Sequence, residues 1–391
     1  MKATLTLATT VLTVAHAFPN MAGLASHLAR QAAADSSVQL IGDLDGKPDS
    51  ELSGTGSAIK SILQRTASPE DLTTSYDSVA DKDSDECRQD TCCIWKHIAD
   101  DMASQMVGTA GRCNGLARQS IRMGFHDAAT WSLLTGKGGG ADGSLVLARE
   151  CYERPVNAAM KGGCDQMQTW YDTYKSYNVS MADLIQMAAN VATVVCPLGP
   201  RVRSFVGRVD SSEPSPDGLL PSENDSADAL IALFGNKTID AADLVALVGA
   251  HTTSQQFGVN ASRAGDPQDS TPGVWDTAFY GETLDAQAPQ RVFKFQSDVN
   301  LSRDPRTSAV WNRFVGARGQ RPWNPSYARA YVRMSLLGVY NINDLTECTK
   351  ALPLAVTSFN SSDADALADF SNGKLQGDVQ TVEQGDLVKD S

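Results

Sequence analysis

The sequence predicts a mainly α-helical protein, because hydrophobic residues recur at three- and four-residue spacing in most of its apolar segments. Runs of alternating β-branched residues, which would favour strands, are few. Segments rich in Gly and Pro lie between the apolar segments and are typical of loops. The length of 391 residues exceeds what one hydrophobic core usually organises, which favours a two-lobed core or two domains. The expected helices span residues 92–107, 115–129, 181–195, 227–234 and 241–250.

Two of these helices have recognisable capping residues at their start. Ser180 precedes the third helix, and Asp183 follows Ser180 by three residues, which is a variant of the capping box. Asp240 stands in the equivalent place before the last helix. We therefore expect these helices to begin at residues 181 and 241.

Both ends of the chain differ in composition from this helical core, which runs over residues 87–356. Residues 1–17 combine Lys2, a short apolar run and small residues near Ala17, a pattern that predicts a cleaved signal peptide; a buried N-terminal helix is the alternative. Residues 18–86 contain no Cys and much Ala, Ser, Asp and Gly. We expect a low-complexity leader or propeptide with few residues to anchor a core. Residues 357–391 are similar and are expected to form a flexible acidic tail.

Charge and hydropathy exclude two classes of partner. The chain has 33 Lys and Arg against 46 Asp and Glu, a net charge of -13, whereas a nucleic-acid-binding protein needs a cationic surface. No segment reaches the roughly 18 to 20 apolar residues that span a membrane. Six N-x-S/T sequons fit an exported glycoprotein. We expect a secreted, extracellular monomer that binds neither nucleic acid nor membranes.

The first histidine with a chemically specific neighbour is His126. Arg122 precedes it by four residues, so in a helix both side chains project from one face. An imidazole there can accept a proton while the guanidinium stabilises developing negative charge, which suits acid–base catalysis on a small polar substrate. The alternative is a solvent-exposed helix face without a chemical role.

The second such histidine, His251, ends an apolar segment that begins at Asp243. It is either a core histidine with satisfied ring nitrogens or a metal ligand, and a ligand needs an acceptor for its other ring nitrogen. Asp298 is a candidate acceptor much later in the chain. Sequence spacing leaves both interpretations open.

Oxygen-rich segments follow both histidines. Asp127 is followed by the segment GGGADGS at residues 138–144, and Thr252 by the segment DSTPGVWD at residues 269–276. Carboxylate, hydroxyl and carbonyl oxygens in turning backbone are the ligands that Ca²⁺ prefers. Neither segment has the spacing of an EF-hand, and each is alternatively an ordinary turn.

Together these segments resemble the secreted haem peroxidases of fungi, class II of the plant-type peroxidase superfamily. The resemblance covers residues 87–356 and implies a two-lobed helical haem peroxidase fold, with haem between a distal lobe (87–205) and a proximal lobe (206–356). It rests on RMGFHD (122–127), GGGADGS (138–144), GRVDSSEPSPDGLLPSE (207–223), ADLVALVGAHT (242–252), DSTPGVWDTAFY (269–280) and FKFQSD (293–298).

The resemblance implies a role for each residue that matches a family motif on the distal side. His126 is the distal acid–base residue, Arg122 is the distal arginine, and Asn157 orients His126. A glutamate usually precedes this asparagine, and both Glu150 and Glu153 are candidates with imperfect spacing.

On the proximal side the resemblance makes His251 the iron ligand and Asp298 the carboxylate bonded to it. Phe125 lies in the haem pocket, and Pro221 lines the channel at the haem edge. The implied cofactors are one haem b and two Ca²⁺ per chain. The distal calcium ligands are Asp127, Gly140, Asp142 and Ser144; the proximal ones are Thr252, Asp269, Thr271, Val274 and Asp276.

Eight cysteines allow 105 sets of four disulfides, and the sequence alone does not choose among them. The resemblance implies Cys87–Cys93, Cys92–Cys348 and Cys113–Cys196. The two remaining cysteines make Cys151–Cys164 a plausible local bridge. The usual C-terminal disulfide of the family has no counterpart here.

The implied reaction uses H₂O₂ to oxidise small phenolic or aromatic reductants in one-electron steps, through compounds I and II. Residues that depart from the family's motifs narrow the range of expected substrates. Ala246 stands where lignin-type peroxidases carry an oxidisable tryptophan. Asn114, Arg118 and Phe257 stand where manganese-oxidising members carry three carboxylates, so oxidation of manganese at that place is not expected.

Two alternatives remain. One is a lignin-active peroxidase that uses a different surface tryptophan or tyrosine; Trp131, Trp170 and Trp275 are candidates for relaying electrons, although a tryptophan is more often a core residue. The other is a non-catalytic secreted protein that keeps the fold for binding. A further departure is Gln268, which stands where the family normally has a phenylalanine under the haem.

Overall fold

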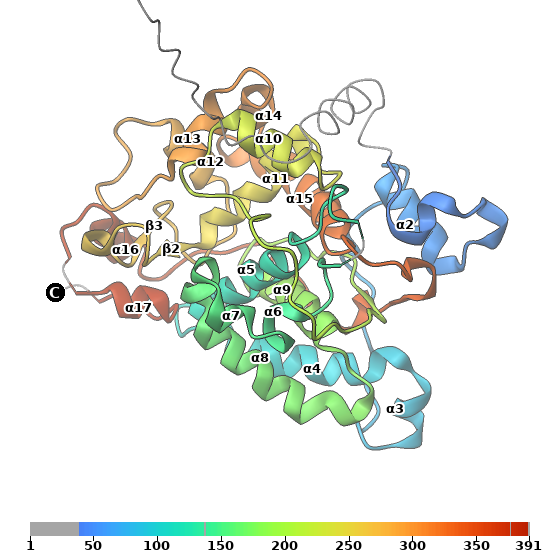
Figure 1. Cartoon of the computed structure of the whole chain (residues 1–391). Helices are drawn as coiled ribbons and strands as arrows, with labels where there is room; N and C mark the ends of the chain where they lie inside the picture. The colour runs from blue at the N-terminus through green and yellow to red at the C-terminus, as the bar shows by residue number, and fades with distance from the viewer. Residues whose placement is uncertain (1–38, 137, 376, 390–391) are drawn as a thin grey trace, which may run out of the picture. The chain divides into compact units, whose positions relative to one another are not determined.

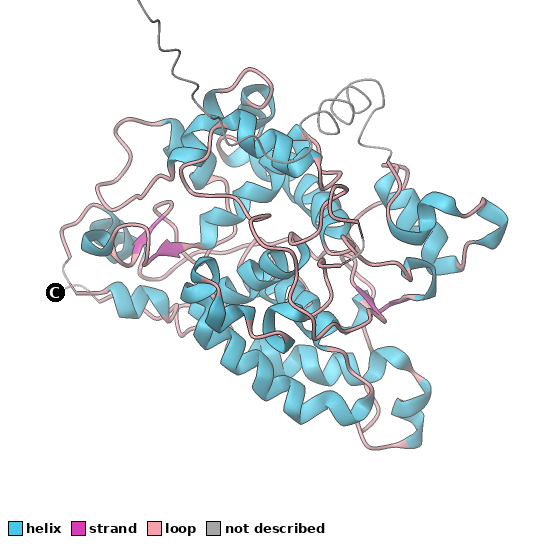
Figure 2. Ribbon diagram, in the orientation of Figure 1, coloured by secondary structure: helices cyan, strands magenta, loops and turns pink. Residues whose placement is uncertain are grey.

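Helices dominate the regular structure of the residues described by this computed structural model, 39–136, 138–375 and 377–389 (Figures 1 and 2). The only named strands in these ranges are four strands of two residues each. The prediction of a mainly α-helical protein is therefore confirmed. The expected signal peptide, residues 1–17, and the first part of the expected leader lie outside the described residues.

The bounds of the elements follow. The α-helices are α2 (Gly54–Leu63), α3 (Asp85–Gln89), α4 (Thr91–Gln105), α5 (Gly115–Ala128), α6 (Ser144–Leu147), α7 (Glu150–Glu153), α8 (Lys161–Tyr174), α9 (Met181–Val195), α10 (Ala227–Gly235), α11 (Ala241–Val248), α12 (Ala278–Leu284), α13 (Gln296–Arg303), α14 (Ser308–Arg313), α15 (Gln320–Met334), α16 (Ala364–Ser371) and α17 (Val379–Glu383). The 3₁₀ helices are η2 (Gly42–Gly46), η3 (Asp49–Glu51), η4 (Pro155–Met160), η5 (Lys175–Tyr177), η6 (Gly249–Thr253), η7 (Ala261–Arg263), η8 (Ala317–Gly319), η9 (Ile342–Asp344) and η10 (Thr349–Ala351).

The strands form two antiparallel pairs. β1 (Phe205–Val206) pairs with β4 (Thr346–Glu347), and Phe205 lies opposite Glu347. β2 (Gln255–Gln256) pairs with β3 (Asp266–Pro267), and Gln255 lies opposite Pro267. The β2–β3 pair closes a short loop, the β1–β4 pair joins segments far apart in the sequence, and neither forms a layer of the fold.

The core is built around α9, whose fifteen residues are all buried, and α5 packs along it. A second packed pair, α11 and α15, belongs to the same hydrophobic core. Ser180 and Asp240 cap α9 and α11, since their side chains accept hydrogen bonds from the backbone N–H groups of Asp183 and Asp243, as the sequence predicted.

The helix that leads to His251 is shorter than expected. α11 ends at Val248, and His251 lies in the tighter helix η6. Gly249 begins η6, and a Cβ there would lie 2.2 Å from the hydroxyl oxygen of Tyr280 and 2.6 Å from the ring of Trp323. The backbone thus approaches these rings more closely than any other residue would allow.

The described part of the expected leader differs from its prediction. Ile59, Ile62 and Leu63 lie on one face of α2, are almost fully buried and belong to the main core, together with Leu44. α2 packs against α15 and η9. Composition alone underestimates this segment, because three apolar residues at helical spacing suffice to anchor a short helix when larger helices supply the opposite surface.

The expected flexible tail also differs from its prediction, since α16 and α17 enclose a small hydrophobic core of their own. It is separate from the main core and consists of Ala366, Leu367, Phe370, Leu375, Val382 and Val388. Low aromatic content had suggested disorder, but six apolar side chains grouped around Phe370 order this segment.

Four disulfides, two of them local and two between distant parts of the chain, join the pairs expected above: Cys87–Cys93, Cys92–Cys348, Cys113–Cys196 and Cys151–Cys164. The second ties α4 to the C-terminal end of the core, and the third ties the start of α5 to the end of α9. Within the described ranges, no helix has the length and apolar character needed to cross a membrane.

Candidate active site

α5 presents His126 to a neighbouring amide. The Nδ1 atom of His126 lies 2.8 Å from Oδ1 of Asn157, and Nε of Arg122 donates to Nε2 of His126 at 3.1 Å. Burial, and then the positive charge of Arg122, lower the pKa of His126 to about 3. His126 is therefore neutral at ordinary pH and can accept a proton at Nε2.

A second hydrogen bond fixes the orientation of Asn157. Its Nδ2 group donates to the backbone carbonyl of Glu150 at 3.1 Å, so Oδ1 is the atom that faces His126. An amide oxygen only accepts, which requires that Nδ1 of His126 carries the proton and Nε2 the lone pair. Asn157 thereby selects the tautomer of His126 that a base needs.

Glu150 and Glu153, between which the sequence left the choice open, lie in different surroundings. The buried carboxylate of Glu150 accepts hydrogen bonds from the backbone N–H (2.7 Å) and hydroxyl (3.0 Å) of Ser215 and pairs with Arg154 at 2.8 Å. Glu153 is exposed and pairs with Arg149. Glu150 thus holds its own backbone carbonyl in place for Asn157.

His251 stands in different surroundings on η6. Its Nδ1 atom lies 3.0 Å from Oδ2 of the buried Asp298 on α13. The rings of Phe279 and Phe295 stand nearly perpendicular to the imidazole, with centroids 5.7 and 5.5 Å away. The described residues give Nε2 no hydrogen-bond partner, and the side chain remains 34% accessible, so Nε2 is available to a metal.

The segment that ends at Glu223 connects the two histidine environments. The negative charge of Glu223 acts on Arg122, and its backbone carbonyl accepts a hydrogen bond from the N–H of Ser297 at 2.9 Å, one residue before Asp298. Pro221 lies two residues earlier and is partly exposed. The sequence gives no sign of a role for Glu223, because its proximity to Arg122 arises only in the fold.

Arg122 is accessible to solvent but surrounded by protein. Desolvation by the surrounding protein lowers its pKa, and the charge of Glu223 opposes this shift. Next to it, the Phe125 ring stands edge-on to His126 at 5.3 Å and stacks on Phe234 at 6.0 Å. These side chains fit haem. Aromatic rings line the site, His251 offers a free imidazole nitrogen, and His126 on another element is a base beside the Arg122 cation.

The first oxygen-rich segment brings two carboxylates together. Asp127 accepts hydrogen bonds from the N–H groups of Gly143 and Leu145, and Asp142 accepts one from Ser144. Burial, and then the charge of Asp142, raise the pKa of Asp127 well above its usual range. Ser144 Oγ is buried and has no partner among the described residues.

Gly140 precedes this pair in a backbone conformation with φ near +109°, and a Cβ there would lie 2.3 Å from the carbonyl oxygen of Leu337. Only glycine fits, so the loop can turn its oxygens toward Asp127 and Asp142. No cationic side chain pairs with either carboxylate in the described part of the chain. Two such carboxylates and an unsatisfied hydroxyl suit a hard divalent cation.

The second oxygen-rich segment repeats this chemistry near His251. The hydroxyl of Thr252 donates to Asp269 Oδ2 and lies 3.4 Å from the carbonyl oxygen of Val274, while Thr271 donates its N–H to Asp269 at 2.9 Å. Burial, and then the charge of Asp276, raise the pKa of Asp269 well above its usual range. This segment therefore also fits a divalent cation.

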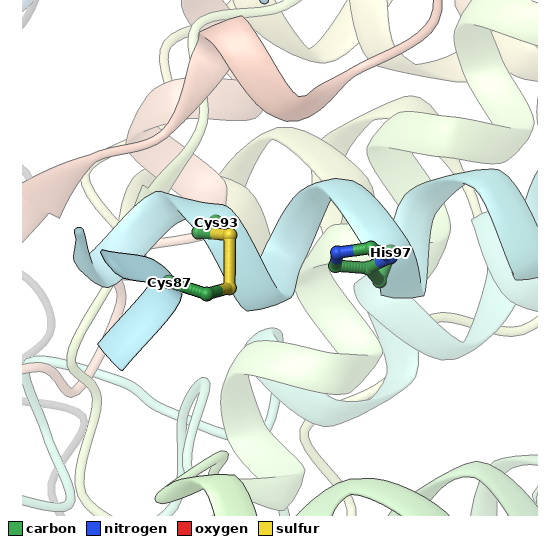
Figure 3. A group of neighbouring side chains, drawn as sticks. All are labelled: Cys87, Cys93 and His97. Atoms are coloured by element: carbon green, nitrogen blue, oxygen red, sulfur yellow. A yellow bond between two sulfur atoms is a disulfide. The ribbon is translucent and has the colours of Figure 1, made fainter. Parts of the chain in front are cut away.

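A third group contains residue types that bind metals, but its sulfur atoms are already used. Cys87 and Cys93 form a disulfide beside His97 (Figure 3). The Nε2 atom of His97 lies 2.8 Å from the carbonyl oxygen of Ala80. A disulfide sulfur is a poor metal ligand compared with a thiolate, so this group has a structural role.

Comparison with known proteins agrees with this geometry. A peroxidase family model matches residues 99–317. The chain is 32% identical to a peroxidase of Arthromyces ramosus and 33% identical to a peroxidase of Coprinopsis cinerea, each over 68% of this chain and 77% of the relative. It is 30% identical to manganese peroxidase 3 of Phlebia radiata over 74% of this chain and 81% of the relative. The chain belongs to the fungal class II haem peroxidases.

Proposed function

We propose that this chain is a secreted peroxidase that uses H₂O₂ to oxidise small phenolic or aromatic reductants, two molecules in two one-electron steps. The observation that carries the proposal is the unequal pairing of the two histidines: His126 bonds a neutral amide, and His251 bonds a carboxylate. His126 is therefore suited to moving protons and His251 to holding a metal.

Haem bound at Nε2 of His251 would supply the redox chemistry of peroxide reduction. Nε2 of His126 would take the proton from the peroxide oxygen nearer the haem and deliver it to the other oxygen, which leaves as water. The Arg122 guanidinium stabilises negative charge as the O–O bond breaks. Asp298 holds the Nδ1 proton of His251 and so raises the basicity of the ligating nitrogen. Phe125 packs beside the base, and Pro221 lies at the edge where reductants approach.

In this proposal, each of the two oxygen-rich segments binds a calcium ion. Asp127, Gly140, Asp142 and Ser144 would hold one ion near His126; Thr252, Asp269, Thr271, Val274 and Asp276 would hold the other near His251. The raised pKa values of the paired carboxylates support both sites, because a divalent cation is the natural counterion for two buried carboxylates. Each chain would thus carry one haem b and two calcium ions.

The oxidising compartment expected from the sequence is supported by four disulfides. We propose that the chain is exported through its N-terminal segment and acts as an extracellular monomer. The catalytic domain would extend beyond the expected residues 87–356, because residues 39–86 contribute to its core.

The test is peroxide-dependent oxidation of guaiacol, an uncharged phenol, by the purified holoprotein. We expect turnover that requires both H₂O₂ and bound haem. A haem-containing protein that fails to oxidise guaiacol or any other phenol would support the alternative, a binding protein that retains the fold.

One observation favours a second candidate function, oxidation of bulky substrates at the surface. The indole N–H of Trp131 donates to the hydroxyl of Tyr340 at 3.3 Å; Trp131 is buried, and Tyr340 is 44% exposed. Trp170 and Trp275 are fully buried and reach no such exposed ring in the described contacts. Under this candidate, Tyr340→Phe abolishes oxidation of a bulky non-phenolic dye and leaves guaiacol oxidation intact.

A further inference from the structure

A cluster of buried aromatic side chains lies against the segment that carries His251. Its members, here named the aromatic cluster, are each at most 1% exposed and are Trp275, Tyr280, Trp311, Trp323, Tyr327 and Tyr331. They come from α12, α14, α15 and the loop before α12, and both α14 and α15 pack on α11 (Figure 1). Tryptophan and tyrosine rings lose one electron readily, so every member of the cluster is a chemically competent electron donor.

The cluster touches the backbone two residues before His251. A Cβ on Gly249 would lie 2.2 Å from the Tyr280 hydroxyl and 2.6 Å from the Trp323 ring. Nε1 of Trp323 donates to the carbonyl of Ala246 at 2.9 Å, in the last turn of α11. The carbonyl groups at the end of a helix form the negative end of its dipole, which stabilises positive charge. The ring of Trp323 therefore lies where a cation is favoured.

Trp323 forms a parallel stack with Trp275. The two ring centroids are 5.1 Å apart, and the ring planes differ by 4°. Two parallel indoles can share a positive charge, which makes the pair easier to oxidise than one indole. The negative charge of Asp298 also reaches this region, because it acts on Tyr280, whose ring centroid lies 5.5 Å from that of Trp323. The stack and the carboxylate both offset the cost of burying a charge.

The hydrogen bonds of the cluster favour oxidation of a tryptophan over that of a tyrosine. A tyrosine gives up its proton when it loses an electron, and burial raises the pKa of Tyr280 well above its usual range. Its hydroxyl donates to the carbonyl of Val245 at 2.8 Å, and a carbonyl is not a base. An oxidised indole can keep its N–H proton, and Nε1 of Trp275 has no acceptor among the described residues. Oxidation of the tryptophan pair therefore moves an electron and no proton.

The described ring contacts of the cluster lead to a single outlet. Outside itself the cluster contacts only Phe279 and Phe314, which are as buried as its members. Phe279 continues to His251, with ring centroids 5.7 Å apart, whereas Phe314 contacts no further ring in the described part of the chain. No exposed ring among these contacts continues the cluster to the surface. An oxidising equivalent in the cluster thus has an aromatic route to His251 and none to solvent.

We propose that Trp275 and Trp323 form an internal electron donor, which stores one oxidising equivalent of the peroxidase while no reductant is bound. This proposal rests on the proposed function. One electron leaves the indole pair toward the oxidised haem, no bond breaks, and the pair keeps both N–H protons as a cation radical. The two equivalents taken from H₂O₂ are then divided between the haem and the pair. A phenol that later donates one electron at the haem edge allows an electron to return to the pair.

The experiment mixes the purified holoprotein with one equivalent of H₂O₂ without reductant, freezes it, and measures organic radicals by electron paramagnetic resonance. Protein grown with ring-deuterated tryptophan identifies a tryptophan radical, because deuterium narrows its hyperfine pattern, and this test needs no substitution. Trp323→Phe and Trp275→Phe keep an aromatic ring but break the indole stack. Trp323→Phe is the cleaner variant, since Trp275 lies between two candidate calcium ligands.

Two controls separate the pair from other aromatic residues. Trp170→Phe is the matched control, because Trp170 is also almost fully buried with an unpartnered indole N–H but stacks on no ring in the described residues. Tyr280→Phe removes the phenol that touches Trp323 and keeps its ring. We expect a tryptophan radical in the full chain and in both controls, and its loss in Trp323→Phe and Trp275→Phe. The haem band should respond to peroxide equally fast in all of them.

A second measurement tests the pair without peroxide. Haem is replaced by a zinc porphyrin, and a light flash in the presence of a cobalt(III) ammine electron acceptor oxidises the porphyrin in place. Transient absorption follows the decay of the oxidised porphyrin. We expect this decay to be faster in the full chain and in Trp170→Phe than in Trp323→Phe, because only Trp323→Phe lacks the stacked pair.

The proposal is overturned if the radical has tyrosine character, if both pair variants keep the tryptophan signal, or if Trp170→Phe loses it equally. An oxidised porphyrin that decays equally fast in the full chain and in Trp323→Phe would also contradict it. A haem band that peroxide leaves unchanged would instead refute the proposed function, while the zinc porphyrin measurement would still decide whether the pair donates an electron.

Discussion

The two histidines of the site differ in the partner of the same ring nitrogen. Nδ1 of His126 meets an amide oxygen of Asn157, whereas Nδ1 of His251 meets a carboxylate oxygen of Asp298. His126 also lies beside the Arg122 cation and is buried, and these surroundings lower its pKa to about 3. His251 lies between two phenylalanine rings and keeps an accessible side chain.

Under the proposed function, this difference lets one residue type serve two purposes within one fold. A neutral amide fixes the tautomer of His126, while burial and the charge of Arg122 lower the ring's pKa more than the amide raises it, so the ring stays neutral and can accept a proton. A carboxylate at Nδ1 increases electron density at Nε2 and makes His251 a better metal ligand.

The largest effect is expected from removing the distal base. His126→Ala should slow the reaction with H₂O₂ by about 10² to 10⁴-fold, the usual contribution of a general acid–base residue, while haem stays bound. Rapid-mixing absorption spectroscopy measures this rate. His97→Ala, which removes a histidine bonded only to the carbonyl of Ala80, is the control and should react normally.

A smaller effect is expected on the proximal side. Asp298→Asn keeps the hydrogen-bond geometry but removes the negative charge, so haem retention or activity should fall by about 10 to 100-fold. Transfer of haem to an excess of an acceptor apoprotein measures retention. Asp304→Asn, at the C-terminal end of α13, where the carboxylate pairs with Arg306, is the control; an equal loss in both variants would argue against a specific role for Asp298.

The pH dependence tests the origin of the low pKa of His126. The rate with peroxide should hold from neutral pH downward and fall only as the pH drops through about 3, where the ring becomes protonated. Arg122→Leu removes a cation that disfavours protonation, so the fall should move to higher pH by about one unit or more. Arg149→Leu is the control. An unshifted pH profile in Arg122→Leu would mean that burial alone lowers the pKa of His126.

Calcium removal should have the mildest effect, a loss of stability. Chelation leaves the carboxylates of Asp127 and Asp142, and of Asp269 and Asp276, facing each other without a counterion. We expect the unfolding temperature to fall by about 5 °C or more and added Ca²⁺ to restore it. Calorimetry with and without chelator measures the shift, and Asp127→Asn should reduce it. An unchanged unfolding temperature would count against both sites.

The sequence predicted the elements that follow from local pattern. Helix α9 and its cap at Ser180 follow from apolar spacing and a capping residue, and both are observed. The resemblance supplied residues such as Asn157 and Asp298, which lie far from their partners in sequence. Whether they meet depends on the packing of η4 on α5 and of α13 near η6, which no local pattern encodes.

The sequence did not predict features that depend on long-range packing of weakly apolar segments. Residues 39–86 and 357–391 both have low complexity, yet Ile59 packs into the main core and Phe370 anchors a small separate core. Arg112 and Asp363 lie 251 residues apart and form a buried ion pair that neither segment suggests alone. Glu223 likewise gains its position beside Arg122 only when the segment at 221–223 folds across the site.

The measurement that tests the central claim most directly is the absorption spectrum of the purified holoprotein before and after one equivalent of H₂O₂. The unequal roles of His126 and His251 predict a haem band that shifts at once on mixing and returns when guaiacol is added. A protein without a haem band, or with a band that peroxide leaves unchanged, would contradict the account.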